Sequence, residues 1–450
     1  MSELLPDPDL DELVQVLNRS SAGSKTELQP SPQDLPRENL PLEEIAPNEA
    51  LRGVLAPQGE AGLDVQRGNS ASASLLPEQS TAVQAGLLEP LFQDLAETGA
   101  SDLLLVPGEP PVLRLHGHLR RSQRPTLTPE DMTALFEPYL GGYRKQKLEQ
   151  RGSVDFSLTW EAARFGAGGA SDSGKTTRRF RINLHRQRGS LAAAVRALPS
   201  EIPSLESLNL PNSLASWGTT AQGLVLLCGA TGSGKSSTLA ALVAEINRTR
   251  ACHIVTIEDP VEYVHPPGKS VVEQLEVGRD TPSFAEALRS TLRQDPDVIL
   301  VGEMRDLETI SAVLTAAETG HLVFSTLHSG DSTRAIYRMV DVFPAQQQAQ
   351  VRHQLSQALS AIVVQHLIPR IGGGGRVPAV EILRATYPVR HHIRRQQFEK
   401  LYNEIHLGQR QGMRTLEASL ASLVSAGAIH VDEARLRANH PEELETLLGV

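Results

Sequence analysis

The stretch Gly229-Ala-Thr-Gly-Ser-Gly-Lys-Ser236 decides the fold class of this chain. It fits the pattern G-x-x-x-x-G-K-[ST] and lies between an apolar run typical of a buried strand, 224–228, and a run typical of a helix, 237–245. Glycines let backbone N–H groups wrap around phosphate oxygens, and the N-terminus of the next helix favours the same anion. Because strand, motif and helix coincide, the stretch predicts a phosphate-binding loop rather than a chance glycine-rich turn.

The predicted loop also assigns roles to side chains. Lys235 is expected to reach the β- and γ-phosphates of ATP, and the Ser236 hydroxyl to ligate Mg²⁺. The predicted nucleotide-binding residues are Gly229, Ala230, Thr231, Gly232, Ser233, Gly234, Lys235, Ser236 and Ser237. A nucleotide phosphate and Mg²⁺ are therefore the expected ligands.

Composition narrows the class of protein. A length of 450 residues with 40% hydrophobic content allows two or three domains with aliphatic cores. No run approaches the roughly 20 apolar residues of a membrane span, and the acidic N-terminus lacks the pattern of a signal peptide, so a cytoplasmic protein is expected. The two cysteines, Cys228 and Cys252, are too few for a disulfide framework or a four-thiolate zinc site.

The net charge of −10 is concentrated at one end of the chain. Residues 1–80 carry 14 acidic and five basic residues, whereas the remaining chain carries 39 and 38. The main body is therefore nearly neutral, which argues against nucleic acid as a partner.

Five regions are expected along the chain. Residues 1–85 read as a disordered, acidic, proline-rich tail, in which 9–17 is either a transient helix or a docking peptide. Residues 86–200 read as a small α+β domain, 201–211 as an interdomain linker, 212–384 as an α/β domain with a parallel sheet, and 385–450 as helical.

Individual elements follow from the local pattern. In the first domain we expect a helix at 89–98, a helix with a capping box starting at Thr128, and a hairpin tip at 166–175. The strands expected there are 101–106, 112–116, 152–158 and 179–184. In the second domain the expected strands are 224–228, 253–257, 298–301 and 322–326.

Carboxylates follow two of these strands. The strand at 253–257 is followed by Glu258, Asp259 and Glu262, and the strand at 298–301 by Gly302 and Glu303. At the carboxyl edge of a P-loop sheet such groups hold Mg²⁺ or polarise the attacking water. Glu303 is thus a candidate for the magnesium shell or for the base, with Gly302 where a Walker B motif usually has Asp. The alternative is that these acids are only solvated turn residues.

Histidines flank the strand at 322–326, with His321 at its start and His328 after its end. The run Ser325-Thr-Leu-His328 resembles the γ-phosphate sensor position of RecA-like motors, so His328 is a candidate catalytic residue. His321 is equally well explained as structural. Arg181 and Arg196 of the first domain, taken alone, read as solvated strand arginines.

In this order the motifs resemble the secretion and pilus ATPase superfamily, and above all the PilT/PilU pilus-retraction ATPases. The resemblance runs from about Leu87 to Leu448 and includes the phosphate loop and three further stretches. These are Glu258-Asp-Pro-Val-Glu262 (Asp box), Asp295-Pro-Asp-Val-Ile-Leu-Val-Gly-Glu303 (Walker B) and Ala317-Glu-Thr-Gly-His-Leu-Val-Phe-Ser-Thr-Leu-His328 (His box).

The resemblance implies a RecA-like ATPase domain preceded by a PAS-like domain, assembled as a homohexamer under the inner membrane at the pilus base. It further implies an inner-membrane platform protein as partner, and a second retraction ATPase is a further candidate. Arg181 and Arg196 match family arginines that help clamp the ATP phosphates, which makes them candidate catalytic residues. Glu262 is then the first choice for activating water and Glu303 for the magnesium shell, with exchange of the two roles left open; Glu258 belongs to the same catalytic set.

The residues after the His box indicate the direction of the motor. No cysteine occurs after Cys252, so the paired C-x-x-C motifs of extension and secretion members are absent and retraction is predicted. The run Tyr387–Gln397 keeps Arg390, Ile393 and Arg394 of the retraction motif but lacks its Glu-Gly-Lys end. The open alternatives are an extension or type II secretion assembly ATPase, an accessory PilU-like ring subunit, and a RecA-like helicase.

Overall fold

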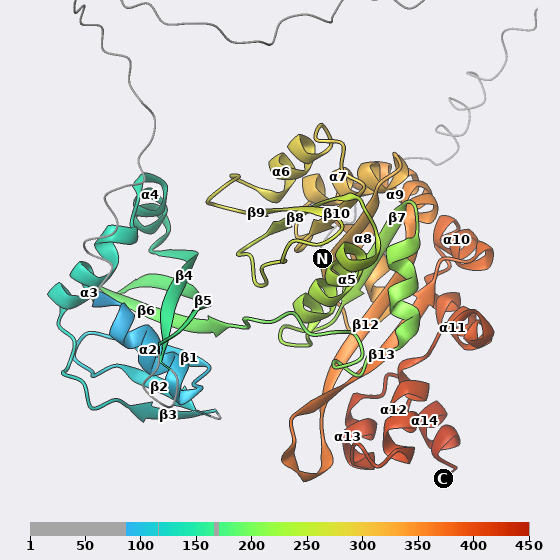
Figure 1. Cartoon of the computed structure of the whole chain (residues 1–450). Helices are drawn as coiled ribbons and strands as arrows, with labels where there is room; N and C mark the ends of the chain where they lie inside the picture. Colours follow the sequence, from blue (N-terminus) through green and yellow to red (C-terminus); the bar gives the residue numbers. More distant parts are fainter. Residues whose placement is uncertain (1–86, 116, 166–170, 450) are drawn as a thin grey trace, which may run out of the picture. The chain divides into compact units, whose positions relative to one another are not determined.

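The computed structural model describes residues 87–115, 117–165 and 171–449. The predicted tail and its segment 9–17 lie outside these residues. Figure 1 labels the helices and strands of the described chain.

The first domain combines an antiparallel sheet with short helices. Its six strands lie in the order β3-β2-β1-β6-β5-β4. They are β1 (Asp102–Leu105), β2 (Val112–Leu115), β3 (His118–Arg121), β4 (Ser153–Phe165), β5 (Ser171–Gln187) and β6 (Ser190–Leu198). The helices are α2 (Glu89–Thr98), α3 (Pro129–Phe136), the 3-10 turn η2 (Glu137–Tyr139) and α4 (Gly142–Arg151).

Alternation along β5 builds the core of this domain. Phe180, Ile182 and Leu184 are buried on one face, and Phe180 stacks on Phe92 of α2 with ring centroids 4.3 Å apart. The predicted helix at 89–98 is confirmed, as is the capping box: the Thr128 hydroxyl accepts from the Asp131 backbone N–H, and the Asp131 carboxylate accepts from that of Thr128.

Three expectations for this domain need correction. Strands β4 and β5 extend well beyond the predicted 152–158 and 179–184, so the predicted tip at 166–175 was too wide. Backbone pairing as far as Ala163 with Lys175 and, after a register shift, Phe165 with Ser171 holds this extension. Backbone hydrogen bonds form with almost any side chain, so the extension leaves no distinctive signal in the sequence. Strand β3 was missed because all four of its residues are exposed, and β6 because its small side chains hide the alternation.

The second domain is built on a seven-stranded sheet in the order β13-β12-β7-β11-β10-β8-β9. The strands are β7 (Gly223–Cys228), β8 (His253–Glu258), β9 (Val271–Glu276), β10 (Val298–Val301), β11 (Leu322–Leu327), β12 (Leu359–Pro369) and β13 (Arg376–Arg384). The four predicted strands are confirmed. The expectation of a parallel sheet was wrong in one respect: β13 runs antiparallel to β12, so the sheet is mixed. The 3-10 turn η4 (Ile371–Gly373) joins the two in a direct hairpin.

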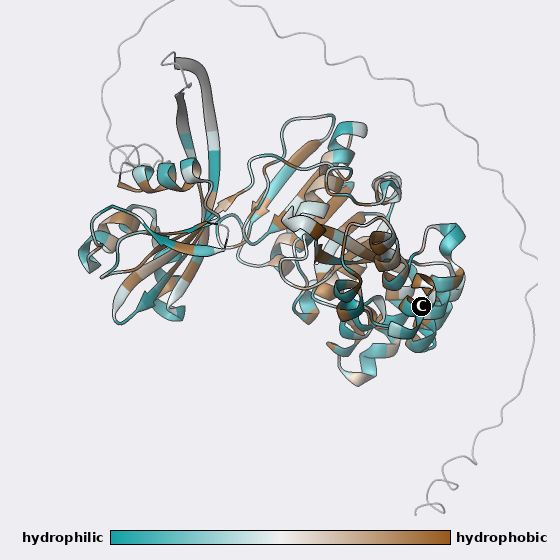
Figure 2. Cartoon of the chain, turned by 90° about the horizontal axis from the view of Figure 1, so that it is seen from below, coloured by the Kyte–Doolittle hydropathy of each residue, from teal (hydrophilic) through white to brown (hydrophobic). Residues whose placement is uncertain are grey.

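Helices cover both faces of this sheet. One face packs on α5 (Lys235–Thr249) and the 3-10 helix η3 (Asn212–Thr219), and Leu205 and Leu210 of the expected linker are buried in that same cluster. The other face packs on α6 (Phe284–Thr291), α7 (Leu307–Glu318), α8 (Ser332–Asp341), α9 (Ala345–Ala358) and α10 (Tyr387–Arg394). Strands β7 and β10 in the middle of the sheet are accordingly apolar throughout, and the centre of this domain is largely brown in Figure 2.

The C-terminal region is helical, as predicted. After α10 come the 3-10 turn η5 (Phe398–Lys400), α11 (Leu401–Leu407), the 3-10 turn η6 (Gln409–Gln411), α12 (Leu416–Ser425), α13 (Val431–Arg437) and α14 (Pro441–Leu448). Leu416, Leu420 and Leu444 pack with Ile368 and Val377 of the β12–β13 hairpin, which anchors these helices to the sheet. Within the described residues, every helix is too short or too polar to span a bilayer.

Candidate nucleotide-binding site

The predicted phosphate loop connects β7 to α5 at the carboxyl edge of the sheet. Gly232 and Gly234 have φ of 78° and 89°, a left-handed conformation that only glycine adopts without strain. The loop therefore wraps back on itself before α5 begins at Lys235. Ser236 lies exposed in the first turn of α5, where the helix N-terminus favours an anion.

Lys235 is buried under this loop. Its Nζ donates to the carbonyl oxygens of Gly229 at 2.8 Å and Ala230 at 3.0 Å, and burial lowers the pKa of its ammonium group. The Ser233 hydroxyl is buried and has no hydrogen-bond partner within the described chain. A buried cation beside an unpartnered hydroxyl and free helix N–H groups fits a phosphate, which supplies acceptors to all of them.

The sheet brings the candidate residues on β8, β10 and β11 to the same edge as the loop. Because these strands are parallel neighbours, the residues at or just beyond their ends, Glu258, Glu303 and His328, leave the sheet side by side. The Glu303 carboxylate lies 2.8 Å from Arg305 Nε and 3.8 Å from His328 Nε2. Burial and the positive charge of Lys235 lower the pKa of His328, while Glu303 opposes that shift.

Glu258 is enclosed at the start of the predicted Asp box. It accepts hydrogen bonds from Thr256 Oγ1 at 2.8 Å, Gln274 Nε2 at 3.3 Å and the Glu262 backbone N–H at 3.3 Å, and burial raises the pKa of its carboxyl group. These bonds shape the turn that presents Glu262. At its far end, the hydroxyl groups of Tyr263 and Ser237 lie 2.8 Å apart, which links the turn to α5.

The structure gives a reason for glycine at position 302. A Cβ there would lie 3.2 Å from the carbonyl oxygen of Ile257 and 3.5 Å from Glu258 Cα. A side chain there, such as the Asp of a usual Walker B motif, would press on the backbone of β8, which would have to shift by a few tenths of an ångström. The carboxylate at this strand end is carried by Glu303 instead.

Arg181 and Arg196 lie directly opposite each other on β5 and β6. Arg181 pairs with Asp155 at 3.4 Å and Arg196 with Asp102 at 2.8 Å, and both guanidinium groups are largely exposed. Among the described contacts neither arginine bonds to the phosphate loop, so the structure does not bring them to the site.

His321 lies at the opposite end of β11 from His328. Its Nδ1 is 2.9 Å from the Ala316 carbonyl oxygen, which is a structural position.

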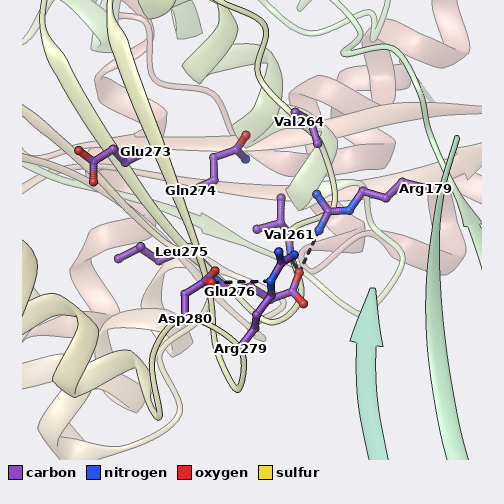
Figure 3. A pocket seen from close by; sticks show the side chains of 9 residues that line it. All are labelled: Arg179, Val261, Val264, Glu273, Gln274, Leu275, Glu276, Arg279 and Asp280. Carbon is purple, nitrogen blue, oxygen red and sulfur yellow. Dashed lines mark hydrogen bonds and ion pairs between the residues drawn. The ribbon is translucent and has the colours of Figure 1, made fainter. Parts of the chain in front are cut away.

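An ion pair that was not predicted from the sequence joins Arg179 of β5 to Glu276 of β9. Arg179 Nη2 pairs with the buried Glu276 carboxylate at 2.9 Å, and Ser157 Oγ donates to the same oxygen at 2.8 Å. Figure 3 shows Arg179 and Glu276 at a pocket whose lining includes no residue of the phosphate loop. The only signal in the sequence is an acidic residue in a strand, which by itself is uninformative.

Another residue that was not predicted, Glu381 of β13, holds the loop that comes after His328. Its buried carboxylate accepts from the Ser332 backbone N–H at 2.8 Å and the Ser332 hydroxyl at 2.6 Å. Burial, with Asp331 and Glu417 adding negative charge, raises the pKa of Glu381 to about 7. A charged residue inside the apolar run Ala379-Val-Glu-Ile-Leu383 was the available signal.

Glu381 should make the stability of the chain depend on pH. Its pKa is higher in the folded chain than its ordinary value of 4.5, so the folded state binds the extra proton between these values. The contribution of Glu381 to the free energy of unfolding should therefore fall as pH rises from about 4.5 to about 7, by about 3 kcal/mol, and then level off. Glu381→Gln keeps the acceptor for Ser332 and should lack this fall.

Urea unfolding at pH 5 and pH 8 measures the effect, with exposed Glu442→Gln as the matched control. The free energy of unfolding of Glu442→Gln should change between pH 5 and pH 8 by the same amount as that of the wild type. Equal pH dependence in wild type and Glu381→Gln would show that Glu381 titrates normally in the folded chain.

A phosphate loop at the carboxyl edge of a mixed sheet, with a buried lysine, a carboxylate and a histidine converging on it, defines a P-loop ATPase. The family model "Type II/IV secretion system protein" matches residues 201–432. The chain belongs to this family.

Individual relatives are similar in sequence to this chain over most of its length. The type IV pilus retraction ATPase PilT of Pseudomonas aeruginosa is 44% identical over 347 residues, which cover 77% of this chain and 96% of the relative. The type IV pilus ATPase PilU of the same organism is 34% identical, with 80% and 91% covered. The crystal structure of the pilus retraction motor PilT with bound ADP superposes with a TM-score of 0.69 at 44% identity, covering 80% of this chain and 99% of that one.

Proposed function

We propose that this chain is the Mg²⁺-dependent ATPase of a motor that retracts type IV pili. The observation that carries the proposal is similarity along nearly the full length of a retraction ATPase, and the buried Lys235 of the phosphate loop and the Glu303–His328 contact support it. The absence of cysteine after Cys252, and hence of paired C-x-x-C motifs, supports retraction over extension. Both halves of the proposal, chemistry and direction, are open to experiment.

The site residues divide the chemistry of hydrolysis between them. Lys235 holds the β- and γ-phosphates, and Ser236 with Glu303 holds Mg²⁺, which neutralises charge on the phosphates when it is bound. A site with only one or two protein ligands suits Mg²⁺, because water molecules and phosphate oxygens fill the rest of its coordination shell. Glu262 activates the attacking water, or exchanges roles with Glu303, and His328 senses the γ-phosphate.

Glu258 acts by positioning Glu262, since the three hydrogen bonds that its carboxylate accepts shape the turn that carries Glu262. Arg181 and Arg196 clamp the phosphates in a different arrangement of the chain. Their present partners, Asp155 and Asp102, form exposed ion pairs that cost little to exchange for a phosphate.

The assembled form is a homohexameric ring of RecA-like domains, each preceded by a PAS-like domain. The ring acts from the cytoplasm at the inner-membrane base of the pilus on a platform protein, and a second retraction ATPase of the PilU kind is a further partner. The extent of the similarity to both PilT and PilU supports this assembly.

Deletion of the gene should leave many surface pili and no twitching movement, because fibres then assemble but are not withdrawn. Electron microscopy of pili together with a twitching assay measures both quantities. Expression of the wild-type chain should restore movement, whereas the Lys235→Ala chain should not.

Other outcomes have a defined meaning. Bare cells would show an extension ATPase, and normal pili with normal twitching would show a redundant or accessory subunit. Either result would contradict the proposed direction or role while leaving the ATPase chemistry intact.

A further inference from the structure

We propose that Gln365 is the positioning residue of the phosphate loop: it acts through the backbone of the loop and not on the nucleotide itself. Gln365 lies on β12, which runs parallel to β7. The strand register places its neighbour Val364 opposite Cys228, the last residue of β7. Gln365 therefore stands beside the point where β7 ends and the loop begins, with only 3% of its surface exposed.

The Gln365 side chain bonds to both ends of the turn into α5. Its Nε2 donates to the carbonyl oxygen of Ser233 at 2.7 Å, and its Oε1 accepts from Thr238 Oγ1 at 2.8 Å. Because a carbonyl oxygen only accepts, this network determines which way the amide faces. One buried side chain thus connects the last part of the loop to the first turn of α5.

Two glycines of the loop leave open the space that Gln365 occupies. A Cβ on Gly234 would lie 2.7 Å from Gln365 Nε2, and a Cβ on Gly229 would lie 2.5 Å from the Gln365 carbonyl oxygen. The loop is therefore packed directly on β12. On the next strand, Arg376 Nη1 donates to the Gly232 carbonyl at 3.3 Å, so the β12–β13 hairpin contacts the loop along its length.

These contacts explain how Gln365 affects nucleotide binding. Phosphate is held by backbone N–H groups whose directions depend on the peptide planes of the loop. Without the amide, the buried Ser233 carbonyl has lost its partner, so its peptide plane rotates toward another donor. Rotation moves the adjoining N–H groups away from the phosphate position, which weakens binding even though no direct contact is lost.

The test uses Gln365→Met, which keeps the volume of the side chain and removes both hydrogen bonds. We expect the dissociation constant for ADP with Mg²⁺, measured by calorimetry on the full chain, to rise about tenfold. We also expect the ADP-induced rise in the unfolding midpoint to shrink. A purely structural role would lower the midpoint with and without ADP by the same amount and leave the dissociation constant unchanged.

A double-mutant cycle tests the Thr238 contact. Thr238→Val should weaken ADP binding about threefold, and Thr238→Ser, which restores the hydroxyl, should bind within about twofold of wild type. The double variant Gln365→Met/Thr238→Val should bind ADP no more than about twofold more weakly than Gln365→Met alone, since the amide partner is already gone. Additive losses would show that the two residues act separately and would overturn the proposed contact.

The proposal rests on nucleotide binding at this loop, so Lys235→Ala is measured in the same experiment. Weak binding by Lys235→Ala with normal binding by Gln365→Met would overturn the role of Gln365 alone. Normal binding by both would show that the site itself is misplaced. If Gln365→Met does not fold, the same binding assay on Thr238→Val and Thr238→Ser decides the question: equal dissociation constants would contradict the proposal.

Discussion

Lys235→Ala should lower the rate of ATP hydrolysis about a thousandfold or more, while the chain still folds. Lys235 is the buried cation of the loop, and its Nζ bonds to the Gly229 and Ala230 carbonyl oxygens in the structure. Loss of a positive group that neutralises charge on a transferring phosphoryl group typically costs several orders of magnitude in rate. Alanine keeps the helical propensity of α5, so the fold should survive. Phosphate release measures the rate, and circular dichroism reports the fold.

Arg248→Ala is the matched control for this variant. Arg248 is a basic residue of the same helix, but it is exposed, and within the described residues its side chain pairs with Glu245 on the surface. Its removal should leave the hydrolysis rate within about twofold of wild type, because exposed ion pairs contribute little. If Lys235→Ala kept more than about a tenth of the wild-type rate, the phosphate-loop assignment would be wrong.

Glu303→Gln should bind ATP and fail to hydrolyse it, with a fall in the turnover rate of about a hundredfold or more. Glu303 follows β10 and lies 3.8 Å from His328 Nε2, and its negative charge opposes the lowering of the Lys235 pKa, which supports its proposed place in the site. Gln preserves the shape of the side chain. Its exposed partner Arg305 loses only a surface ion pair, so the fold should be unaffected.

A magnesium titration decides which of Glu303 and Glu262 binds Mg²⁺ and which activates the attacking water. If Glu303 is in the metal shell, Glu303→Gln should raise the Mg²⁺ concentration needed for half-maximal activity, and Glu262→Gln should lower turnover alone. The reverse pattern would assign the base to Glu303. Glu308→Gln is the control, since Glu308 is exposed on α7 and pairs with Arg289 away from the loop. Wild-type turnover in Glu303→Gln would remove Glu303 from the site.

Much of the fold followed from local patterns in the chain. The four strands β7, β8, β10 and β11 were predictable because each is a mostly apolar run whose central residues are buried on both faces of the sheet. The capping box at Thr128 was predictable because both of its hydrogen bonds join residues three apart. Strand β13 was not predictable in the same way, since its antiparallel direction depends on the hairpin that connects it to β12.

The missed residues share one property. Gln365, Glu381 and Glu276 each bond to partners far away in sequence: 132 residues for the Ser233 carbonyl, 49 for Ser332 and 97 for Arg179. A polar residue in an apolar strand signals that some partner exists, because buried polar groups are almost always hydrogen-bonded. It does not say which partner, since that depends on strand order and register.

The amino-acid sequence by itself determined the phosphate loop and the buried strand before it, because both depend on neighbouring residues with fixed conformational preferences. It also supplied the candidates Glu303 and His328, as residues that come after strand runs. The meeting of the Glu303 and His328 side chains, and the hydrogen bond from Gln365 to the loop, depend on the tertiary structure. Those contacts arise from the pairing of strands distant in sequence, and a one-residue change of register would direct each side chain to the opposite face.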